Sequence, residues 1–295
     1  MGDEFPYVPG VEHRFLEVDG IEVHLAEAGP PEAPPVLLLH GFPQHWYLWR
    51  PLLERLGNEY RLLAPDLRGF GWTEAPGYGY DTETFAADQL ALLDALGVER
   101  AAVIGHDWGG ITAFILAIRH PGRVSALLSL NVPPPFSRLT ARLVLEQWRT
   151  WYAALLASPV LGLRVVRSGA MPRLMFGRGL SAEEIEIYLS PLRQPERAAA
   201  AQALYRAYPR LARRVAGGVY RRMRLEVPAR VLFGEKDLAI SKELLRGHEP
   251  YADDLEIELV GDAGHFIVEQ KPDLVLARVR ELLAAHAPAG TAKTS

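Results

Sequence analysis

The sequence predicts an α/β fold built on a mostly parallel β-sheet. Short apolar runs alternate along the chain with segments of helical periodicity, which is the pattern of α/β proteins. Most runs are apolar at nearly every residue, as expected of strands that helices cover on both faces. A block with helical patterns alone interrupts this alternation between residues 140 and 219. The chain therefore combines an α/β core with an inserted helical unit.

The composition is that of a globular protein with a large core. Hydrophobic residues make up 49% and charged residues 23% of the chain, and the formal net charge is -4. This charge, without any lysine or arginine run, argues against nucleic acid or an anionic membrane as a partner. Cysteine is absent, which excludes thiolate nucleophiles and cysteine-based metal sites. We find no signal-peptide pattern and no apolar run of the ~20 residues that span a bilayer, so we expect a cytoplasmic protein.

Six apolar runs precede the helical block and two follow it. The first two, residues 13–18 and 22–28, form a predicted hairpin. The other strands are predicted at residues 36–39, 61–64, 101–105, 125–130, 229–233 and 255–260. Helical periodicity is clearest at residues 82–96 and 110–119.

The inserted block sets the domain organisation. Residues 132–135 read VPPP, through which neither a helix nor a central strand continues. We assign residues 1–133 to the first part of the core, residues 134–222 to a helical cap and residues 223–295 to the second part of the core. The residues from about Ala287 are predicted to form a loose tail.

The clearest chemical motif is a tight turn between a strand and a helix. Residues 105–110 read GHDWGG, after an apolar strand and before a helical segment. This is the context of a nucleophile elbow, in which small neighbours permit a turn that raises one side chain above the sheet. The raised side chain is Asp107, and the helix N-terminus favours its ionised form. Because aspartate is also a common helix cap, the turn alone leaves both interpretations open.

A carboxylate nucleophile permits a reaction that a serine does not. It can displace at a saturated carbon and form an alkyl ester whose carbonyl group belongs to the enzyme. Water that attacks this carbonyl group releases the product as an alcohol. Suitable substrates are therefore epoxides and alkyl halides.

Two further residues complete a triad with Asp107, in the chain order nucleophile, acid and histidine that can accompany such an elbow. His265 lies in the glycine-bearing loop after the last strand, where folds with such an elbow carry their general base. Asp237 follows the preceding strand and is placed to accept the imidazole N–H. Glu235 competes locally, and the other possible acid position holds Asn131, which carries no charge. An ordinary loop histidine is the alternative to a catalytic His265.

The loop after the third strand contains a candidate oxyanion donor. Residues 40–43 read HGFP, and in hydrolases with an elbow this loop supplies one backbone donor while the residue after the nucleophile supplies the other. The predicted donors are the N–H groups of Phe42 and Trp108. A plain turn at the strand end is the alternative, because glycine and proline suit it equally well.

Together these motifs resemble those of the epoxide hydrolases that adopt the α/β-hydrolase fold. The HGFP loop, continued by WYLWR at residues 46–50, is similar to their HGFP-x-x-WY-x-WR signature, with Gln44 where an acidic residue is frequent. DLRGFG at residues 66–71 resembles their D-x-R-G-x-G loop. The similarity extends over about residues 15–283. It implies an eight-stranded, mostly parallel sheet with helices on both faces and an inserted helical cap.

The resemblance also implies two cap tyrosines that hydrogen-bond the epoxide oxygen. Tyr152, after Trp151, resembles the first, and Tyr205, before Arg206, resembles the second. Such donors lower the barrier to ring opening because the alkoxide leaving group is basic. Packing in the cap is the alternative for both tyrosines. The competing tyrosines are Tyr188, Tyr208 and Tyr220.

The implied activity is the hydrolysis of a small apolar epoxide to a vicinal diol, with no cofactor and no metal ion. The predicted substrate contacts are Phe42, Trp108, Trp151 and Phe266. The sequence leaves the oligomeric state open between a monomer and a homodimer.

Two other functions compete with this one. A dehalogenase of the same fold also attacks through an aspartate elbow, but Phe42 stands where haloalkane dehalogenases generally use asparagine. Trp108 likewise stands where fluoroacetate dehalogenases use arginine. A non-catalytic binding protein is the second alternative, since a fold does not dictate function. All three triad positions are filled, which argues against it.

Overall fold

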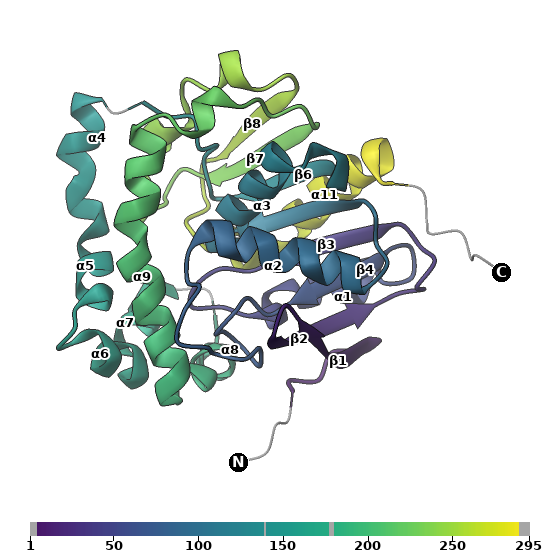
Figure 1. The fold of residues 1–295 in the computed structure, drawn as a ribbon, viewed down its shortest axis with the longest axis horizontal. Coiled ribbons are helices and arrows are strands. Elements are labelled where there is room, and N and C mark those ends of the chain that lie inside the picture. The colour runs from purple at the N-terminus through teal and green to yellow at the C-terminus, as the bar shows by residue number, and fades with distance from the viewer. Residues whose placement is uncertain (1–4, 139, 177–179, 289–295) are drawn as a thin grey trace.

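The computed structural model describes residues 5–138, 140–176 and 180–288, and its centre is one eight-stranded sheet (Figure 1). The strand order is β1-β2-β4-β3-β5-β6-β7-β8. β1 pairs with β2 and β2 pairs with β4 in antiparallel fashion, and all later pairs are parallel. The strands are β1 (Val11–Val18), β2 (Ile21–Ala28), β3 (Pro35–Leu39), β4 (Arg61–Pro65), β5 (Ala101–His106), β6 (Val124–Leu130), β7 (Ala229–Gly234) and β8 (Leu255–Val260). All eight predicted strands are confirmed, with ends that agree within two residues.

Helices cover both faces of the sheet because successive residues of its buried strands point to opposite sides. Leu37 and Leu39 of β3 belong to the hydrophobic core beneath α2 and α3, whereas Val36 and Leu38 belong to the core beneath α1 and α11. The helices of these layers are α1 (Arg50–Leu56), α2 (Thr82–Ala95), α3 (Trp108–Arg119), α10 (Ile267–Gln270) and α11 (Pro272–His286). α3 begins two residues before the predicted start, directly after the elbow.

A helical insertion separates β6 from β7 and lies to one side of the sheet, at the left of Figure 1. Its helices are α4 (Ala141–Leu145), α5 (Trp151–Ala157), α6 (Gly162–Ser168), α7 (Ala170–Phe176), α8 (Ala182–Leu189) and α9 (Pro195–Ala216). The long helix α9 packs against α5 and α6. It begins with Pro195, whose fixed φ suits the first turn of a helix. Ser181 and Glu184 form a capping box at the start of α8.

Short 3₁₀ helices connect these elements. They are η1 (Trp46–Trp49), η2 (Pro121–Arg123), η3 (Glu146–Thr150), η4 (Pro191–Arg193), η5 (Tyr220–Arg222), η6 (Lys242–Leu245) and η7 (Glu249–Tyr251). The predicted loose tail lies, from residue 289 onward, outside the described residues.

A buried polar cluster fastens the insertion to the core. The Glu269 carboxylate, on α10 and 3% exposed, accepts bonds from both Arg50 Nη atoms, at 3.0 and 2.9 Å. The Tyr188 hydroxyl of α8 also donates to Glu269 and accepts from Arg50 Nη1 at 3.1 Å. Arg50 reaches Glu184 of α8 as well, at 2.8 Å. Such charge-assisted bonds are strong where water is excluded, so α8 is held against the segment that follows His265.

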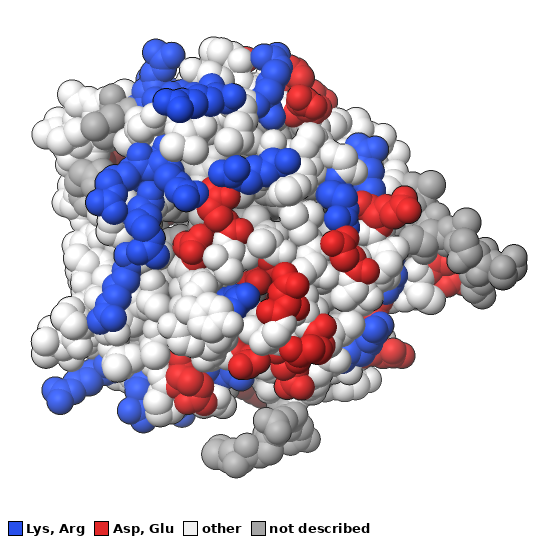
Figure 2. Space-filling model, in the orientation of Figure 1, with Lys and Arg blue, Asp and Glu red and all other residues white. Residues whose placement is uncertain are grey.

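Basic side chains form a band along α9 on the face shown in Figure 2, and acidic side chains lie next to it. Within this region, Arg214 of α9 forms an ion pair with Glu83, at 2.6 Å. The arginines of α9 are Arg197, Arg206, Arg210, Arg213 and Arg214. None of the described helices combines the length and the apolar character that a membrane crossing requires.

We predict that Tyr188→Phe weakens the attachment of the insertion. The substitution keeps the ring but removes a buried hydroxyl that has two partners, so the free energy of unfolding should fall by about 1–2 kcal/mol. The matched control is Tyr251→Phe, whose hydroxyl accepts a 3.4 Å bond from the exposed Arg138; its effect should stay within about 0.5 kcal/mol. Urea unfolding of both variants tests this, and equal losses would contradict it.

Candidate active site

Asp107 occupies a strained turn between β5 and α3. Its φ of 50° and ψ of -122° form a combination that residues other than glycine rarely adopt. Neighbouring glycines make room for this turn. A Cβ on Gly105 would lie 2.4 Å from the Gly109 carbonyl oxygen, and a Cβ on Gly109 would lie 2.1 Å from that of Leu39. A Cβ on Gly41 would lie 2.4 Å from the Asp107 Cβ. The glycines of the GHDWGG and HGFP motifs therefore permit this close approach of backbone to the Asp107 side chain.

Backbone N–H groups hold the Asp107 carboxylate. The Phe42 N–H donates to Oδ2 at 2.9 Å, and the Trp108 N–H helps to lower the pKa of the carboxyl group. These are the two N–H groups that the sequence predicts for the oxyanion hole. Burial raises the pKa of Asp107 above its usual 3.8, while His265 and these two N–H groups oppose that shift. The carboxylate is poorly solvated, which favours its action as a nucleophile.

His265 and Asp237 lie beside Asp107 as a triad requires. His265 Nδ1 lies 2.8 Å from Asp237 Oδ2, and His265 Nε2 lies 3.7 Å from Asp107 Oδ1. Burial would raise the pKa of Asp237, but His265 and several hydrogen bonds hold it below its usual 3.8. An ionised carboxylate can only accept, so Nδ1–H is the donor. This leaves Nε2 directed toward Asp107, where a base would activate water.

Asn131, at the end of β6, supports the acid in a way that sequence analysis missed. Its Nδ2 donates to Asp237 Oδ2 at 2.8 Å, and its Oδ1 accepts from the Gly234 N–H at 3.2 Å. The N–H groups of Ala239 and Ile240 bond Asp237 Oδ1 at 2.7 and 2.9 Å. The sequence signal is the position of Asn131, because an amide at the alternative acid site can donate to a charge beside it. Together these bonds fix both carboxylate oxygens.

The His265 imidazole is charged in the resting site at neutral pH. Burial disfavours the charge, but Asp237 and Asp107 outweigh burial and raise the pKa of His265 from 6.5 to about 9. The neighbouring His106 donates from Nε2 to the His265 carbonyl at 2.8 Å. Burial lowers the pKa of His106 to about 3, so that ring stays neutral. The resting site therefore holds one imidazolium between two carboxylates.

A cavity of about 530 Å³ extends from Asp107 and Trp108 between the core and the helical insertion. Tyr152 of α5 and Tyr205 of α9 both line it, with ring centroids 6.0 Å apart and edge to face. Burial is the main cause that raises the pKa of each tyrosine; Asp107 adds to it at Tyr152, and Tyr152 and then Asp107 add to it at Tyr205, so both stay protonated donors. Most of the remaining wall is apolar, with Ile111, Val132, Leu143, Leu211 and Ile240 among its residues.

The other predicted substrate contacts lie in different surroundings. Trp108 lines the cavity, but Phe42, Trp151 and Phe266 are not among its lining residues. The Phe42 ring packs edge-on against Tyr205 at 5.3 Å. Trp151 is 52% exposed. Phe266 is buried, with its ring 5.1 Å from that of His265. Within the described residues, no cluster of three or more histidine, aspartate or glutamate side chains could hold a metal ion.

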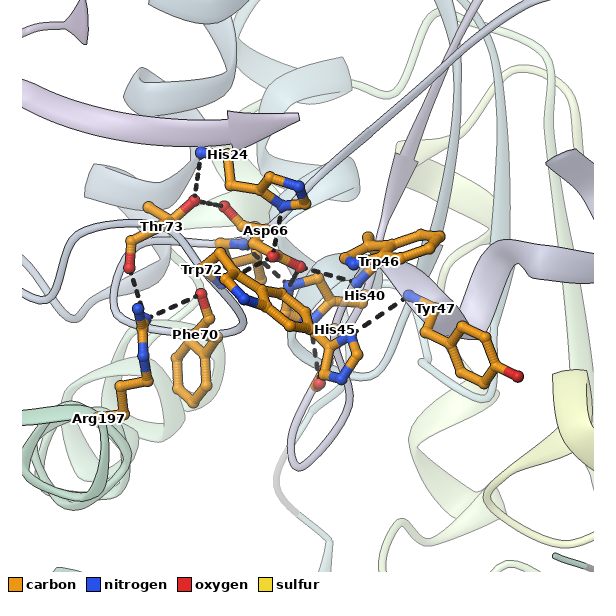
Figure 3. Close-up of polar contacts among 12 residues, drawn as sticks. His24, His40, His45, Trp46, Tyr47, Asp66, Phe70, Trp72, Thr73 and Arg197 are labelled. Carbon is orange, nitrogen blue, oxygen red and sulfur yellow. Dashed lines mark hydrogen bonds and ion pairs between the residues drawn. The ribbon is translucent and has the colours of Figure 1, made fainter. Parts of the chain in front are cut away.

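A second buried aspartate, Asp66, anchors the loop that carries Phe42 (Figure 3). Asp66 Oδ1 accepts from the Trp46 N–H at 2.8 Å. Its Oδ2 accepts from the Trp72 N–H at 2.9 Å and from His24 Nδ1 at 2.7 Å. Burial alone would raise the pKa of Asp66, but the neighbouring histidines hold it well below its usual range. The charged Asp66 thus ties the two loops that the D-x-R-G-x-G and HGFP motifs mark in the sequence.

The chain belongs to the α/β-hydrolase fold family. The family described as alpha/beta hydrolase fold matches residues 34–272. The chain is also 31% identical to the AB hydrolase superfamily protein YfhM of Bacillus subtilis (strain 168), over 93% of this chain and 98% of that protein. The fold class predicted from the sequence is thereby confirmed.

Several similar proteins are named epoxide hydrolases. Epoxide hydrolase 4 of Mus musculus is 28% identical, over 89% of this chain and 77% of that protein. The structure of epoxide hydrolase CorEH superposes with a TM-score of 0.81 at 25% identity, over 93% of this chain and 99% of that one. Epoxide Hydrolase A from Mycobacterium thermoresistibile gives a TM-score of 0.77 at 27% identity, over 94% and 99%. The predicted family resemblance is confirmed, and with it the prediction of a hydrolase.

Gly109→Ala should unfold the elbow, because its Cβ would meet the Leu39 carbonyl oxygen at 2.1 Å and backbone there cannot move aside. We expect a loss of at least about 2 kcal/mol in the free energy of unfolding. Gly122→Ala is the matched control, since its Cβ meets nothing within 4 Å, and it should change that energy by less than about 0.5 kcal/mol. Indistinguishable urea unfolding midpoints would refute the packing argument.

The pKa of His265 should depend on Asp237. An imidazole NMR titration is expected to give about 9 for the wild type and a much lower value for Asp237→Asn, which removes the strongest cause that raises it. Because the folded pKa exceeds the unfolded 6.5, protonated His265 stabilises the fold below about pH 6.5, and this stability is lost as the pH rises through about 9.

The control for this titration is Asp262→Asn. Asp262 is exposed and paired with Lys271, so its loss should leave the His265 titration in place. An unchanged pKa in Asp237→Asn would show that the acid does not tune the histidine.

Proposed function

We propose that the protein is an epoxide hydrolase, which converts an apolar epoxide to a vicinal diol through an ester on Asp107. The observation that carries the proposal is a partly buried carboxylate at the elbow, with the imidazole of His265 on one side and a cavity lined by tyrosines on the other. The relatives that are named epoxide hydrolases support the reaction class.

In the proposed first step, Asp107 attacks a ring carbon while Tyr152 and Tyr205 bind the ring oxygen. The bond between the attacked carbon and that oxygen breaks as the ester bond forms. The oxygen takes a proton from a tyrosine and becomes the first hydroxyl group of the product. Both phenols suit this task because burial raises the pKa of each and keeps it protonated.

In the proposed second step, His265 removes a proton from water, which attacks the ester carbonyl carbon. The Phe42 and Trp108 N–H groups stabilise the tetrahedral oxyanion. The bond to the product oxygen breaks, and that oxygen takes the proton from His265. The carboxyl group of Asp107, now containing the water oxygen, ionises, and its proton restores the tyrosine. Epoxide and water thus give diol and unchanged enzyme.

Ester formation itself prepares the base. The negative charge of Asp107 is one cause of the raised pKa of His265, and an ester carries no charge. The pKa of His265 therefore falls after the first step, so the imidazolium releases its proton to solvent and the neutral imidazole becomes available when water must be activated. His265 takes up a proton from solvent again once Asp107 is ionised at the end of the cycle.

We propose a role for each part of the chain. The helical insertion at residues 134–222 acts as a cap that places both tyrosines over the nucleophile, while residues 1–133 and 223–295 form the core. Hydrolysis by this triad needs no cofactor. The cytoplasmic location, the absence of nucleic acid and membrane partners, and the monomeric or homodimeric state stay predictions.

The labelling test uses water enriched in oxygen-18. Wild-type enzyme should convert styrene-type, aliphatic or polycyclic epoxides to diols and, over repeated turnovers, should acquire the label in the peptide that contains Asp107. Haloalkanes serve as controls for the dehalogenase alternative. Diol formation without any label in Asp107 would exclude the ester mechanism, and halide release without diol formation would exclude the epoxide hydrolase.

A further inference from the structure

A third tyrosine, Tyr208, lines the same cavity as Tyr152 and Tyr205, and the proposed mechanism gives it no task. It lies on α9, three residues after Tyr205. Residues at this spacing share one helix face, with Cβ atoms about 5–6 Å apart. The same face continues along the cavity with Leu211 and Val215. Along this face, Tyr208 is thus the next polar residue after Tyr205, which is predicted to bind the ring oxygen.

The indole of Trp108 lies between the two tyrosines and fixes their rings. Its ring centroid is 5.8 Å from that of Tyr205 and 6.2 Å from that of Tyr208, and both contacts are edge to face. These contacts place the Tyr208 ring beside that of Trp108, the residue that follows Asp107.

The Tyr208 hydroxyl has no hydrogen-bond partner among the described residues. Burial raises the pKa of Tyr208, so the group remains a protonated donor. Tyr208 is also one of the lesser causes that raise the pKa of Tyr152 and of Tyr205. Tyr208 is partly buried in the cavity wall, so its hydroxyl is free to donate to a ligand. A ligand oxygen in the cavity would supply the missing partner.

The arginines that line the cavity either bond other groups or are exposed. Arg149 donates to the Asp237 carbonyl oxygen at 3.0 Å and lies near Glu146. Arg138 and Arg213 are exposed. Tyr208 therefore offers a neutral donor in the wall of the cavity, which can donate to a neutral acceptor oxygen.

We propose that Tyr208 is a specificity-determining residue that binds a second oxygen of the substrate, one or two carbon atoms from the epoxide ring. The inference rests on the proposed epoxide hydrolysis and narrows its substrate class to oxygen-substituted epoxides, such as glycidyl ethers. Within such molecules the two oxygens lie well within one helical turn, about 5.4 Å, so Tyr205 and Tyr208 reach both at once. The apolar wall beyond Tyr208 holds the remainder of the substrate.

The test compares two epoxides that differ in one atom. Phenyl glycidyl ether carries an ether oxygen next to the ring-bearing carbon, and (2-phenylethyl)oxirane has a methylene group there. Tyr208→Phe should lower kcat/KM for the ether about tenfold, as expected for one lost hydrogen bond. It should leave the methylene analogue within about twofold. Tyr205→Phe is the matched control and should reduce kcat/KM for both epoxides.

Two results overturn the inference. Equal losses on both epoxides would mean that Tyr208 acts on the ring oxygen, and no loss on either would mean that Tyr208 only packs. Thermal melting of Tyr208→Phe checks that the ring still supports the fold.

A binding measurement separates this inference from the proposed function. If the wild type forms no diol from either epoxide, the proposed function is wrong. Tryptophan fluorescence titration then still tests Tyr208, since the wild type should bind the ether more tightly than its analogue and Tyr208→Phe should not. The absence of that preference in the wild type overturns the inference.

Discussion

The backbone of Asp107 is the constraint on which the rest of the site depends. A φ of 50° at a residue other than glycine is unfavourable, and it persists because packed segments surround it. Asp107 directly follows β5 and directly precedes α3. The loop after β3 lies so close to Asp107 that Gly41 has no room for a side chain. The same close approach lets the Phe42 N–H reach the carboxylate. The geometry that exposes the proposed nucleophile therefore also positions its proposed oxyanion donor.

Charge is distributed around this turn in a way that suits the two steps of the proposed reaction. Asp237 is the fixed charge, because Asn131 and two backbone N–H groups occupy its oxygens. Asp107 is the variable charge, because an ester would remove it. His265 lies between them, so its pKa follows the state of Asp107. Asp66 and the cluster around Glu269 hold the two loops that flank these residues.

Much of the fold, and the grouping of Asp107, Asp237 and His265, could be predicted from the sequence, since both depend on local patterns. Buried strands read as apolar runs, and the elbow requires glycines at fixed spacing. The support from Asn131 was not predicted, because it pairs with a residue 106 positions away. Side-chain direction in the helices was equally unreadable: Trp151 and Tyr152 are adjacent, yet Trp151 is half exposed and Tyr152 lines the cavity. Tyr208 was named only as a competitor, because its place beside Trp108 depends on how α9 packs.

Direct detection of the ester tests the central claim most sharply. In His265→Gln the base is lost while Asp107 and its N–H donors remain, so the first step should proceed and the second should stop. After incubation with an epoxide, mass spectrometry of the digested protein should find the peptide that contains Asp107 heavier by the mass of one epoxide. An unmodified peptide, under conditions in which wild-type enzyme forms diol, would contradict the account.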